Sequence, residues 1–243
     1  MSRPAPRLAS VRLKFPGPLT PGRLVRRYKR FLADVELAGG EVVTAHCPNS
    51  GSMLGCLEDH APVMLSRAAN PARRTAYTWE MIRINHGWVG VNTLAPNHLA
   101  ALAAEARALK IFAGARRVRR EVKVDSHTRL DLVVERRRGP LYVEVKNVTM
   151  VLEGVARFPD SVTQRGARHL ETLIAMKRQG AGAAMLYVVQ RGGARAMGPA
   201  GHIDPTYARL FHQAREVGVE LVAVEAAVSP QEIRLTRRLP LAE

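Results

Sequence analysis

The stretch from Arg129 to Val148, RLDLVVERRRGPLYVEVKNV, is the part of the sequence that most constrains the fold. Two runs rich in Val and Leu flank the break RRRGP, and alternating runs around a glycine-containing break are typical of a β-hairpin. If residues 136–139 form the loop, antiparallel counting places Asp131 directly opposite Glu144. Side chains in opposite positions share one face of the sheet, with Cβ atoms about 5 Å apart.

Lys146 lies two residues beyond Glu144, so the period of a strand places it on the same face. Two carboxylates at this separation can hold Mg²⁺ or Mn²⁺, which favour oxygen ligands. The ion would lower the pKa of a bound water, while the lysine could orient that water or stabilise charge on the phosphate. The hairpin therefore predicts metal-assisted phosphodiester hydrolysis, with Asp131, Glu144 and Lys146 as catalytic residues and the two acids as metal ligands.

A solvated ion-pair lattice on the outer face of the sheet is the alternative interpretation of these three residues, since such a lattice costs little. A pattern this short also recurs by chance. Tyr142 and Val148 are predicted to share the face with the charged groups. Charges that stand among apolar groups are more often functional, which favours a site.

The segment NHLAALAAEARALKIF predicts an Ala- and Leu-rich helix with Asn97 as its N-cap. Glu105 lies in the middle of this helix and is a candidate third metal ligand, although a lone Glu on such a helix is more often solvated. Glu121 follows among cations in RRVRREVKV and is a candidate supporting residue.

A second helix is predicted to begin at Asp160 or Ser161, where Ser161 and Gln164 have the spacing of a capping box. Arg165 and His169 fall on one face of this helix. We predict Gln164, Arg165 and His169 as supporting residues of the hairpin site.

Basic residues dominate the charge of the chain, with 37 Lys and Arg against 21 Asp and Glu and a net charge of +16. This balance favours a polyanionic partner, nucleic acid, with DNA as the first expectation. The first thirty residues contain no acid, and GRLVRRYKRF alternates cations with aromatic residues, which suits phosphates and bases respectively. Phe31 is expected in the core, and the predicted nucleic-acid contacts are Arg23, Arg26, Arg27, Tyr28, Lys29 and Arg30.

Short alternating runs separated by Gly, Pro and Asn follow as far as residue 84 and predict a small closed β-barrel of the OB-fold type. We therefore expect a barrel domain over residues 1–84 and a second domain over 85–243. The uncharged loop around Asn49 and Ser50 could present amide groups to a phosphate, and a plain β-turn explains it equally well.

Cys47 and Cys56 are the only cysteines, so a disulfide framework is excluded and a reducing compartment is expected. Together with His46 and His60 they lack the spacing of ordinary zinc sites. The chain has no signal-peptide pattern and no apolar run of about 18 residues, which predicts a cytoplasmic protein that does not enter membranes.

From Asn97 the predicted order is helix, three strands, helix, strand, helix, strand, with the two acids on the second and third strands. This order resembles the core of the PD-(D/E)XK nuclease superfamily. From about Gly17 to Val228 the chain resembles the sugar fermentation stimulation protein family (SfsA). Six strings carry the resemblance: RYKRFLADV, AHCPNSGSMLGC, WVGVNT, LDLVVE, YVEVKNVT and FPDSVTQRGARHL.

The resemblance implies a two-domain α/β protein, with an amino-terminal OB-fold barrel and a carboxy-terminal nuclease-like domain containing a mixed sheet, and it implies DNA binding. The superfamily's metal-site acids fall on Asp131 and Glu144 and its lysine on Lys146. The chain departs from the family pattern in two places, since Leu130 and not Pro precedes the first acid, and Gln164 stands where many relatives have Glu.

Two functions follow from these observations. The first is a DNA-binding protein with a Mg²⁺- or Mn²⁺-dependent nuclease site, and the second is a non-catalytic DNA-binding regulator linked to sugar metabolism. The intact triad favours the enzyme, because carboxylates that face phosphates weaken simple binding.

Overall fold

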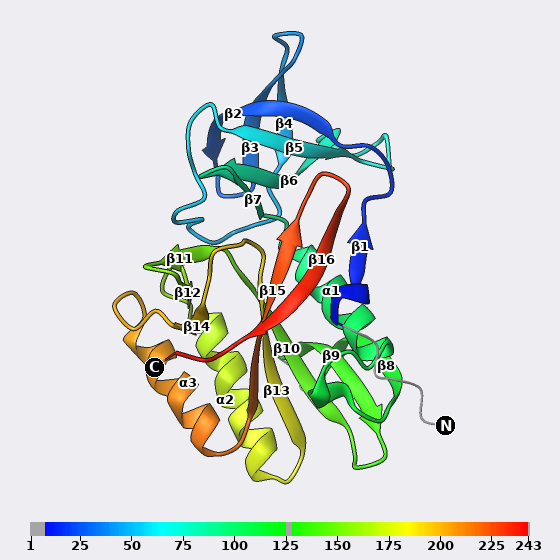
Figure 1. Ribbon diagram of the computed structural model, residues 1–243, viewed down its shortest axis with the longest axis vertical. Coiled ribbons are helices and arrows are strands. Elements are labelled where there is room, and N and C mark those ends of the chain that lie inside the picture. The colour runs from blue at the N-terminus through cyan, green and yellow to red at the C-terminus, as the bar shows by residue number, and fades with distance from the viewer. Residues whose placement is uncertain (1–7, 125–127, 243) are drawn as a thin grey trace.

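A barrel stands above a larger α/β unit in the computed structural model, which describes residues 8–124 and 128–242 (Figure 1). The barrel sheet has the order β4-β3-β2-β5-β6-β7, and a parallel pairing of β4 with β6 closes five of these strands. Its strands are β2 (Thr20–Tyr28), β3 (Leu32–Leu37), β4 (Val42–His46), β5 (Pro62–Arg67), β6 (Tyr77–Ile84) and β7 (Gly87–Gly90).

The barrel interior explains why these alternating runs fold together. Trp79 on β6 is fully buried, and Leu24, Val35 and Leu65 from three other strands complete the apolar filling. Closure leaves the barrel with few free strand edges, which is how small β-domains limit edge-to-edge association. The expected OB-type barrel is confirmed.

The limits of the barrel sheet differ from the predicted domain of residues 1–84. β7 pairs with β6 and extends this sheet to Gly90. At the other end, β1 (Arg12–Lys14) pairs with β16 of the lower unit. Strand β1 has three residues and β7 has four. Neither is long enough to show the apolar alternation that would predict a strand from the sequence.

The lower unit is built on a seven-stranded mixed sheet with the order β1-β16-β15-β13-β10-β9-β8. The three central strands are parallel, and the outer strands pair antiparallel. The strands besides β1 are β8 (Ala115–Lys123), β9 (Arg129–Arg136), β10 (Leu141–Val148), β13 (Gly182–Val189), β15 (Glu220–Val228) and β16 (Glu232–Leu239).

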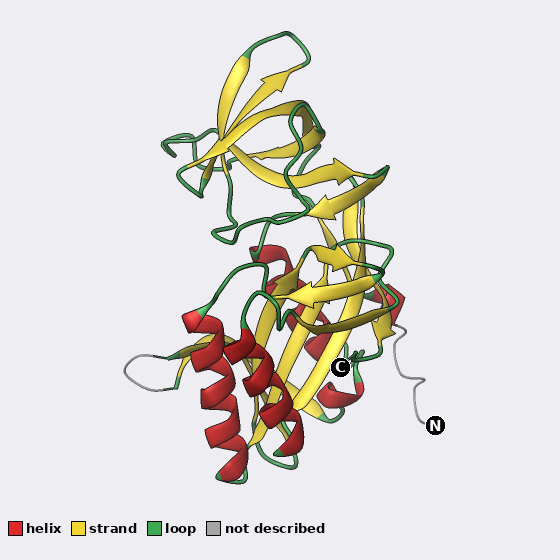
Figure 2. Ribbon diagram, turned by 90° about the vertical axis from the view of Figure 1, so that its left-hand side faces the viewer, coloured by secondary structure: helices red, strands yellow, loops and turns green. Residues whose placement is uncertain are grey.

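Helices cover both faces of this sheet. Two helices lie side by side on one face, as Figure 2 shows, and their apolar stripes bury Leu170 and Phe211 against the sheet. One helix covers the other face. The helices are α1 (Leu94–Glu105), α2 (Gln164–Arg178) and α3 (Pro205–Glu216), with short 3-10 helices η1 (Leu8–Ser10) and η2 (Lys110–Phe112).

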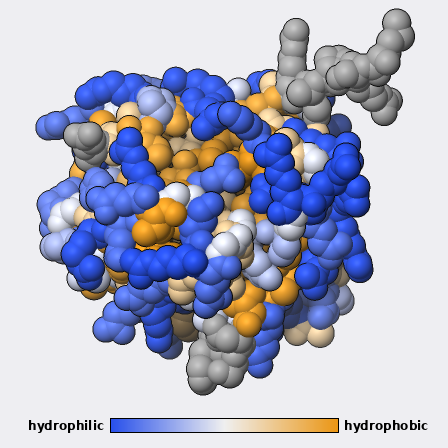
Figure 3. Space-filling view, turned by 90° about the horizontal axis from the view of Figure 1, so that it is seen from below, coloured by the Kyte–Doolittle hydropathy of each residue, from blue (hydrophilic) through white to orange (hydrophobic). Residues whose placement is uncertain are grey.

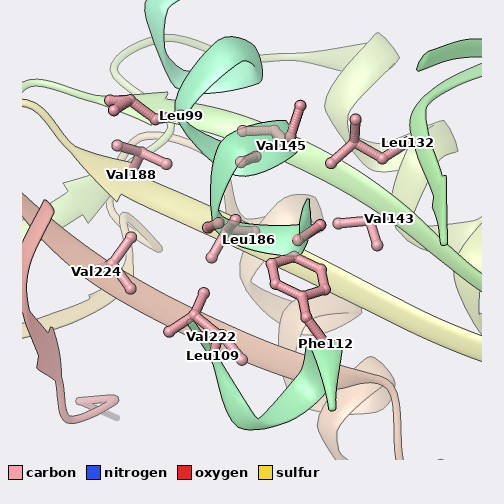
Figure 4. Packing of buried hydrophobic residues seen from close by; sticks show 14 of the residues in the cluster. Leu99, Leu109, Phe112, Leu132, Val143, Val145, Leu186, Val188, Val222 and Val224 are labelled. Carbon is pink, nitrogen blue, oxygen red and sulfur yellow. The ribbon is translucent and has the colours of Figure 1, made fainter. Parts of the chain in front are cut away.

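Strand β10 separates apolar from charged side chains by its period of two. Val143 and Val145 pack under α1 with Leu99, Leu132 and Leu186 (Figure 4). Glu144 and Lys146 alternate with them and point to the opposite face. The core on one side of the strand therefore fixes the register of the acids on the other.

Three further strands form a small sheet that the sequence analysis did not predict, with the order β11-β12-β14. They are β11 (Met150–Leu152), β12 (Val155–Phe158) and β14 (Ala196–Pro199). Strand β16 was also missed. Hydrophilic side chains cover most of the end of the molecule remote from the barrel and surround smaller apolar areas (Figure 3).

Two predicted helix starts are wrong. α1 begins at Leu94 with Thr93 at the N-cap, because Pro96 fits the first turn of a helix, where its missing N–H costs nothing. α2 begins at Gln164, and the side chain of Thr163 accepts the hydrogen bond from the Gly166 N–H at 3.0 Å, so Ser161 is not the cap. No helix of the described residues is long and apolar enough to span a membrane.

Gln190 joins the two units and generates the first prediction. Its buried Nε2 donates to the carbonyls of Gly90 and Asn92 and to Oδ1 of Asn147, at 3.2, 3.1 and 2.9 Å. Gln190→Ala leaves these acceptors without a donor, so we expect the free energy of unfolding in urea to fall by about 2–3 kcal/mol. The exposed Gln231→Ala is the control, and an equal stability of both variants would contradict this role.

Candidate active site

Asp131 on β9 and Glu144 on β10 lie opposite each other, in the register predicted from the hairpin loop. The ladder pairs Val134 with Leu141 and Val143 with Leu132, so the two acids are the next pair. At that point Oδ2 of Asp131 accepts the N–H of Val145 at 2.7 Å, and a side chain replaces the main-chain ladder. The carboxylate is thus oriented by the neighbouring strand.

Glu144 is buried, with 3% of its surface exposed, and it is the centre of a charged cluster. Its Oε1 accepts from Nζ of Lys146 at 2.6 Å and contacts Nδ1 of His169, which lies 3.1 Å from the same Nζ. Burial raises the pKa of Glu144, but Lys146 and His169 outweigh burial and hold it below its ordinary value. Oε2 is buried and has no hydrogen-bond partner among the described residues.

The pKa of Asp131 is shifted in the opposite direction to that of Glu144. Burial, followed by the negative charge of Glu144, raises the pKa of Asp131 to about 7, against the opposing effect of the Val145 N–H. Nδ2 of Asn97 donates to Oδ1 at 2.7 Å. Asn97 was predicted as a helix cap, but it lies one turn inside α1 and orients a site carboxylate. Apart from the polar side chain, no pattern around Asn97 indicates this role.

Asp131, Glu144 and Lys146 line one cleft of about 520 Å³ between the two units. The lower unit contributes Arg165 and His169 from α2, as the spacing on that helix predicted. The barrel contributes an uncharged loop. Its cleft-lining residues are Asn49, Ser50 and Gly51.

Asp160 fastens this barrel loop to the lower unit. Its Oδ2 accepts the N–H of Met53 at 2.7 Å, and its carbonyl accepts the Ser52 hydroxyl at 2.6 Å. Gly51 fits closely beneath it, because a Cβ there would lie 3.0 Å from Oδ1 of Asp160. The loop is therefore a fixed wall of the cleft.

Arg27 was predicted to contact nucleic acid, but its Nη2 donates to three carbonyls of the protein. The acceptors are Arg30, Asn49 and Gly51, at 2.7, 2.8 and 2.8 Å. The two N–H groups of Nη2 are therefore shared among three acceptors. Arg27 shapes the loop beside the site.

Three more of the predicted nucleic-acid contacts are engaged within the barrel. Nε of Arg26 donates to Asp34 at 2.8 Å, and its guanidinium lies 5.0 Å from the ring centroid of Tyr28. The Tyr28 hydroxyl donates to the same aspartate at 3.1 Å. Arg23 donates to the carbonyl of His60. Lys29 is exposed, and Arg30 lines the cleft.

Glu105 does not belong with the hairpin acids. It is exposed at the last position of α1, whereas the first turns of this helix face the cleft, with Leu94 and Asn97 in its lining. Gln164 is exposed and is not part of the lining. Glu121 does line the cleft, and its Oε2 lies 4.0 Å from Nη1 of Arg129.

Across residues 8–124 and 128–242, no three His, Cys, Asp or Glu side chains are grouped closely enough to hold a metal by themselves. Asp131 and Glu144 could supply two oxygen ligands, and main-chain carbonyls or water would supply the others that a hard cation takes. Cys47 and Cys56 are buried free thiols in the barrel core.

Two family models together match most of the chain. The SfsA N-terminal OB domain matches residues 25–91, and the sugar fermentation stimulation protein RE domain matches residues 94–232. The chain belongs to the sugar fermentation stimulation protein family. A homologue of this family from Geobacter sulfurreducens is 50% identical over 226 residues, which cover 93% of this chain and 97% of the homologue.

Relatives from other organisms extend this similarity. The SfsA homologue of Methylobacterium nodulans is 48% identical over 234 residues, covering 94% of this chain and 99% of the homologue. The solved structure of Pyrococcus furiosus SfsA in complex with Ca²⁺ superposes with a TM-score of 0.88 at 24% identity. It covers 95% of this chain and 98% of that one, so the two-unit fold is shared over nearly the whole length.

Asp131 makes the stability of the metal-free SfsA chain depend on pH. Since folding raises its pKa from 3.8 to about 7, the native state binds the proton more tightly. Its stabilising contribution is complete below the unfolded pKa and is lost as the pH rises to about 7. We expect the difference in unfolding free energy between wild type and Asp131→Asn, measured in EDTA, to fall between about pH 4 and about pH 7. A difference that does not change with pH would contradict the raised pKa.

Proposed function

We propose that this chain is a divalent-metal-dependent phosphodiesterase that acts on nucleic acid, with DNA as the first substrate to test. The observation that carries the proposal is the buried Oε2 of Glu144, which has no hydrogen-bond partner among the described residues and belongs to a residue that lines the cleft together with Asp131. An unpartnered buried carboxylate oxygen costs roughly 1–3 kcal/mol or more. A bound cation removes this cost.

The residues present fit such an ion. Asp131 and Glu144 would hold it, and its charge would offset the repulsion that raises the pKa of Asp131. When bound, the ion supplies the chemistry of lowering the pKa of a water and offsetting phosphate charge. The Ca²⁺ in the Pyrococcus furiosus relative supports a site for a hard cation, and Mg²⁺ or Mn²⁺ are the ions proposed here for catalysis.

The protein's own groups orient the site and bind the phosphate. Asn97 and the Val145 N–H hold the two oxygens of Asp131, and His169 with Lys146 holds Oε1 of Glu144. Nζ of Lys146 lines the cleft, where an ammonium group stabilises negative charge as it develops on a phosphate.

Two arginines are available for the phosphates. The guanidinium groups of Arg30 and Arg165 line the cleft from the barrel and from α2, and neither forms a hydrogen bond or ion pair with another described residue. Guanidinium groups bind phosphate through paired N–H donors. The net charge of +16 adds a long-range attraction for a polyanion.

Cleavage of a DNA oligonucleotide in Mg²⁺ or Mn²⁺ tests the enzyme. Asp131→Asn removes a charged ligand while it keeps the shape, so we expect the rate to fall about 10²-fold or more. Glu105→Gln is the matched control, since this exposed acid lies outside the cleft. EDTA should abolish cleavage by the wild type.

Equal cleavage by wild type and Asp131→Asn would assign the activity to a contaminant. Binding of DNA without cleavage by any form would favour the non-catalytic regulator linked to sugar metabolism. Calorimetric titration with Mn²⁺ measures metal binding directly in both proteins. The proposal expects Asp131→Asn to bind Mn²⁺ more weakly than the wild type.

The salt dependence of DNA binding tests the two arginines. If each neutralises one phosphate, Arg30→Gln combined with Arg165→Gln reduces the slope of log K against log salt by about 1.4 to 1.8. The control combines Arg178→Gln and Arg209→Gln, which remove two exposed charges of the helices outside the cleft. A slope that responds equally to both pairs would contradict a specific role for the cleft.

A further inference from the structure

Two strongly exposed apolar side chains line the cleft, whose lining is mostly polar. Val162 is 71% exposed and Leu94 is 58% exposed, which are the two largest values among the exposed large hydrophobic residues of the described chain. Both line the cleft that contains Asp131 and Glu144. Single exposed apolar residues are ordinary, but two beside a charged centre require an explanation.

The fold holds both side chains where they are. Leu94 is the first residue of α1, and Asn97, which binds Asp131, lies three residues later on the same helix surface. Val162 lies between two anchored residues. Asp160 bonds to the barrel loop, and the N–H of Thr163 donates to Oδ2 of Asp204 at 2.9 Å.

We propose that Leu94 and Val162 contact the faces of unpaired bases, so that the substrate class is single-stranded nucleic acid or the frayed end of a duplex. This inference rests on the proposed function for the position of the phosphate. In a paired duplex the backbone is outermost and the base faces are stacked away. In a single strand every base face is free for stacking and apolar contact.

The charges of the cleft agree with this occupant. Arg30 and Arg165 can hold phosphates, which fix the position of a strand but do not need apolar neighbours. The faces of unpaired bases offer Leu94 and Val162 more apolar surface than the sugars and phosphates of the backbone. Aliphatic side chains do contact and separate bases where proteins unstack nucleic acid.

The barrel offers a further base contact next to Arg30. We expected Phe31 in the core, but 52% of it is exposed, because its carbonyl accepts the Cys47 N–H while the ring stays outside the barrel core. Aromatic rings of this kind stack on unpaired bases. Phe31 follows Arg30 in the chain and does not itself line the cleft.

Binding measured in EDTA tests the inference independently of cleavage. The probes are a fluorescein-labelled single strand of DNA, the same sequence as RNA, and the same sequence as a blunt DNA duplex. At equal salt we expect the wild type to bind the single strands at least about tenfold more tightly than the duplex. Leu94→Ser combined with Val162→Thr should remove most of this preference and leave the salt slope unchanged.

The control combines Val42→Thr and Leu152→Ser, which are 56% and 40% exposed and lie outside the cleft. A measurement on the wild type alone adds a second readout. The fluorescence of 2-aminopurine in the single strand should change on binding as its stacking partners change.

Equal affinity for single strands and duplex would overturn the inference, as would an equal loss of both in the cleft variant. A single-strand preference without any cleavage would sustain it while the phosphodiesterase proposal failed. Cleavage of a duplex without a preference for single strands in binding would overturn this inference and sustain the phosphodiesterase proposal.

Discussion

The buried Glu144 carboxylate is the interaction on which the rest of the site depends. A charge with 3% exposure is tolerated only when it is paired, and Lys146 and His169 both contact its Oε1. The lysine comes from the same strand, whereas the histidine requires α2 to lie across it. The position of this helix is thereby coupled to the charge state of the hairpin, and Oε2 is left for a ligand.

The barrel and the α/β unit form one site because polar contacts join them beside the cleft. Asp160 binds the loop at Met53, and Gln190 binds main-chain carbonyls after β7. Arg27 then fixes the loop from the barrel side. Family models match both units, and residues of both units line the cleft between them.

The sequence predicted what depends on local periodicity. The alternation of the hairpin determined the register of Asp131 and Glu144, and the spacing on α2 placed Arg165 and His169 together. The role of Asn97 was missed, because a hydrogen bond between residues 34 positions apart leaves no pattern.

The intramolecular bonds of the predicted nucleic-acid contacts were missed for a related reason, and their contact with nucleic acid stays a prediction. A run of basic residues shows charge, but it does not show which guanidinium groups bond to their own protein. Arg26 and Arg27 donate to Asp34 and to loop carbonyls, while the Arg26 side chain stays 68% exposed. Glu105 was placed in the middle of the helix because the helix was expected to continue to Phe112, whereas α1 ends at Glu105.

The wall of the cleft has a consequence for how this family could diversify. The carboxylate of Asp160 holds the loop on one side and the guanidinium of Arg27 holds it on the other. The width of the cleft opening is therefore set when the chain folds. Selectivity among substrates must then come from substitutions of the residues at the rim of the cleft. Relatives that bind different substrates should differ at the residues of the cleft rim and keep the contacts that Asp160 and Arg27 make with the loop.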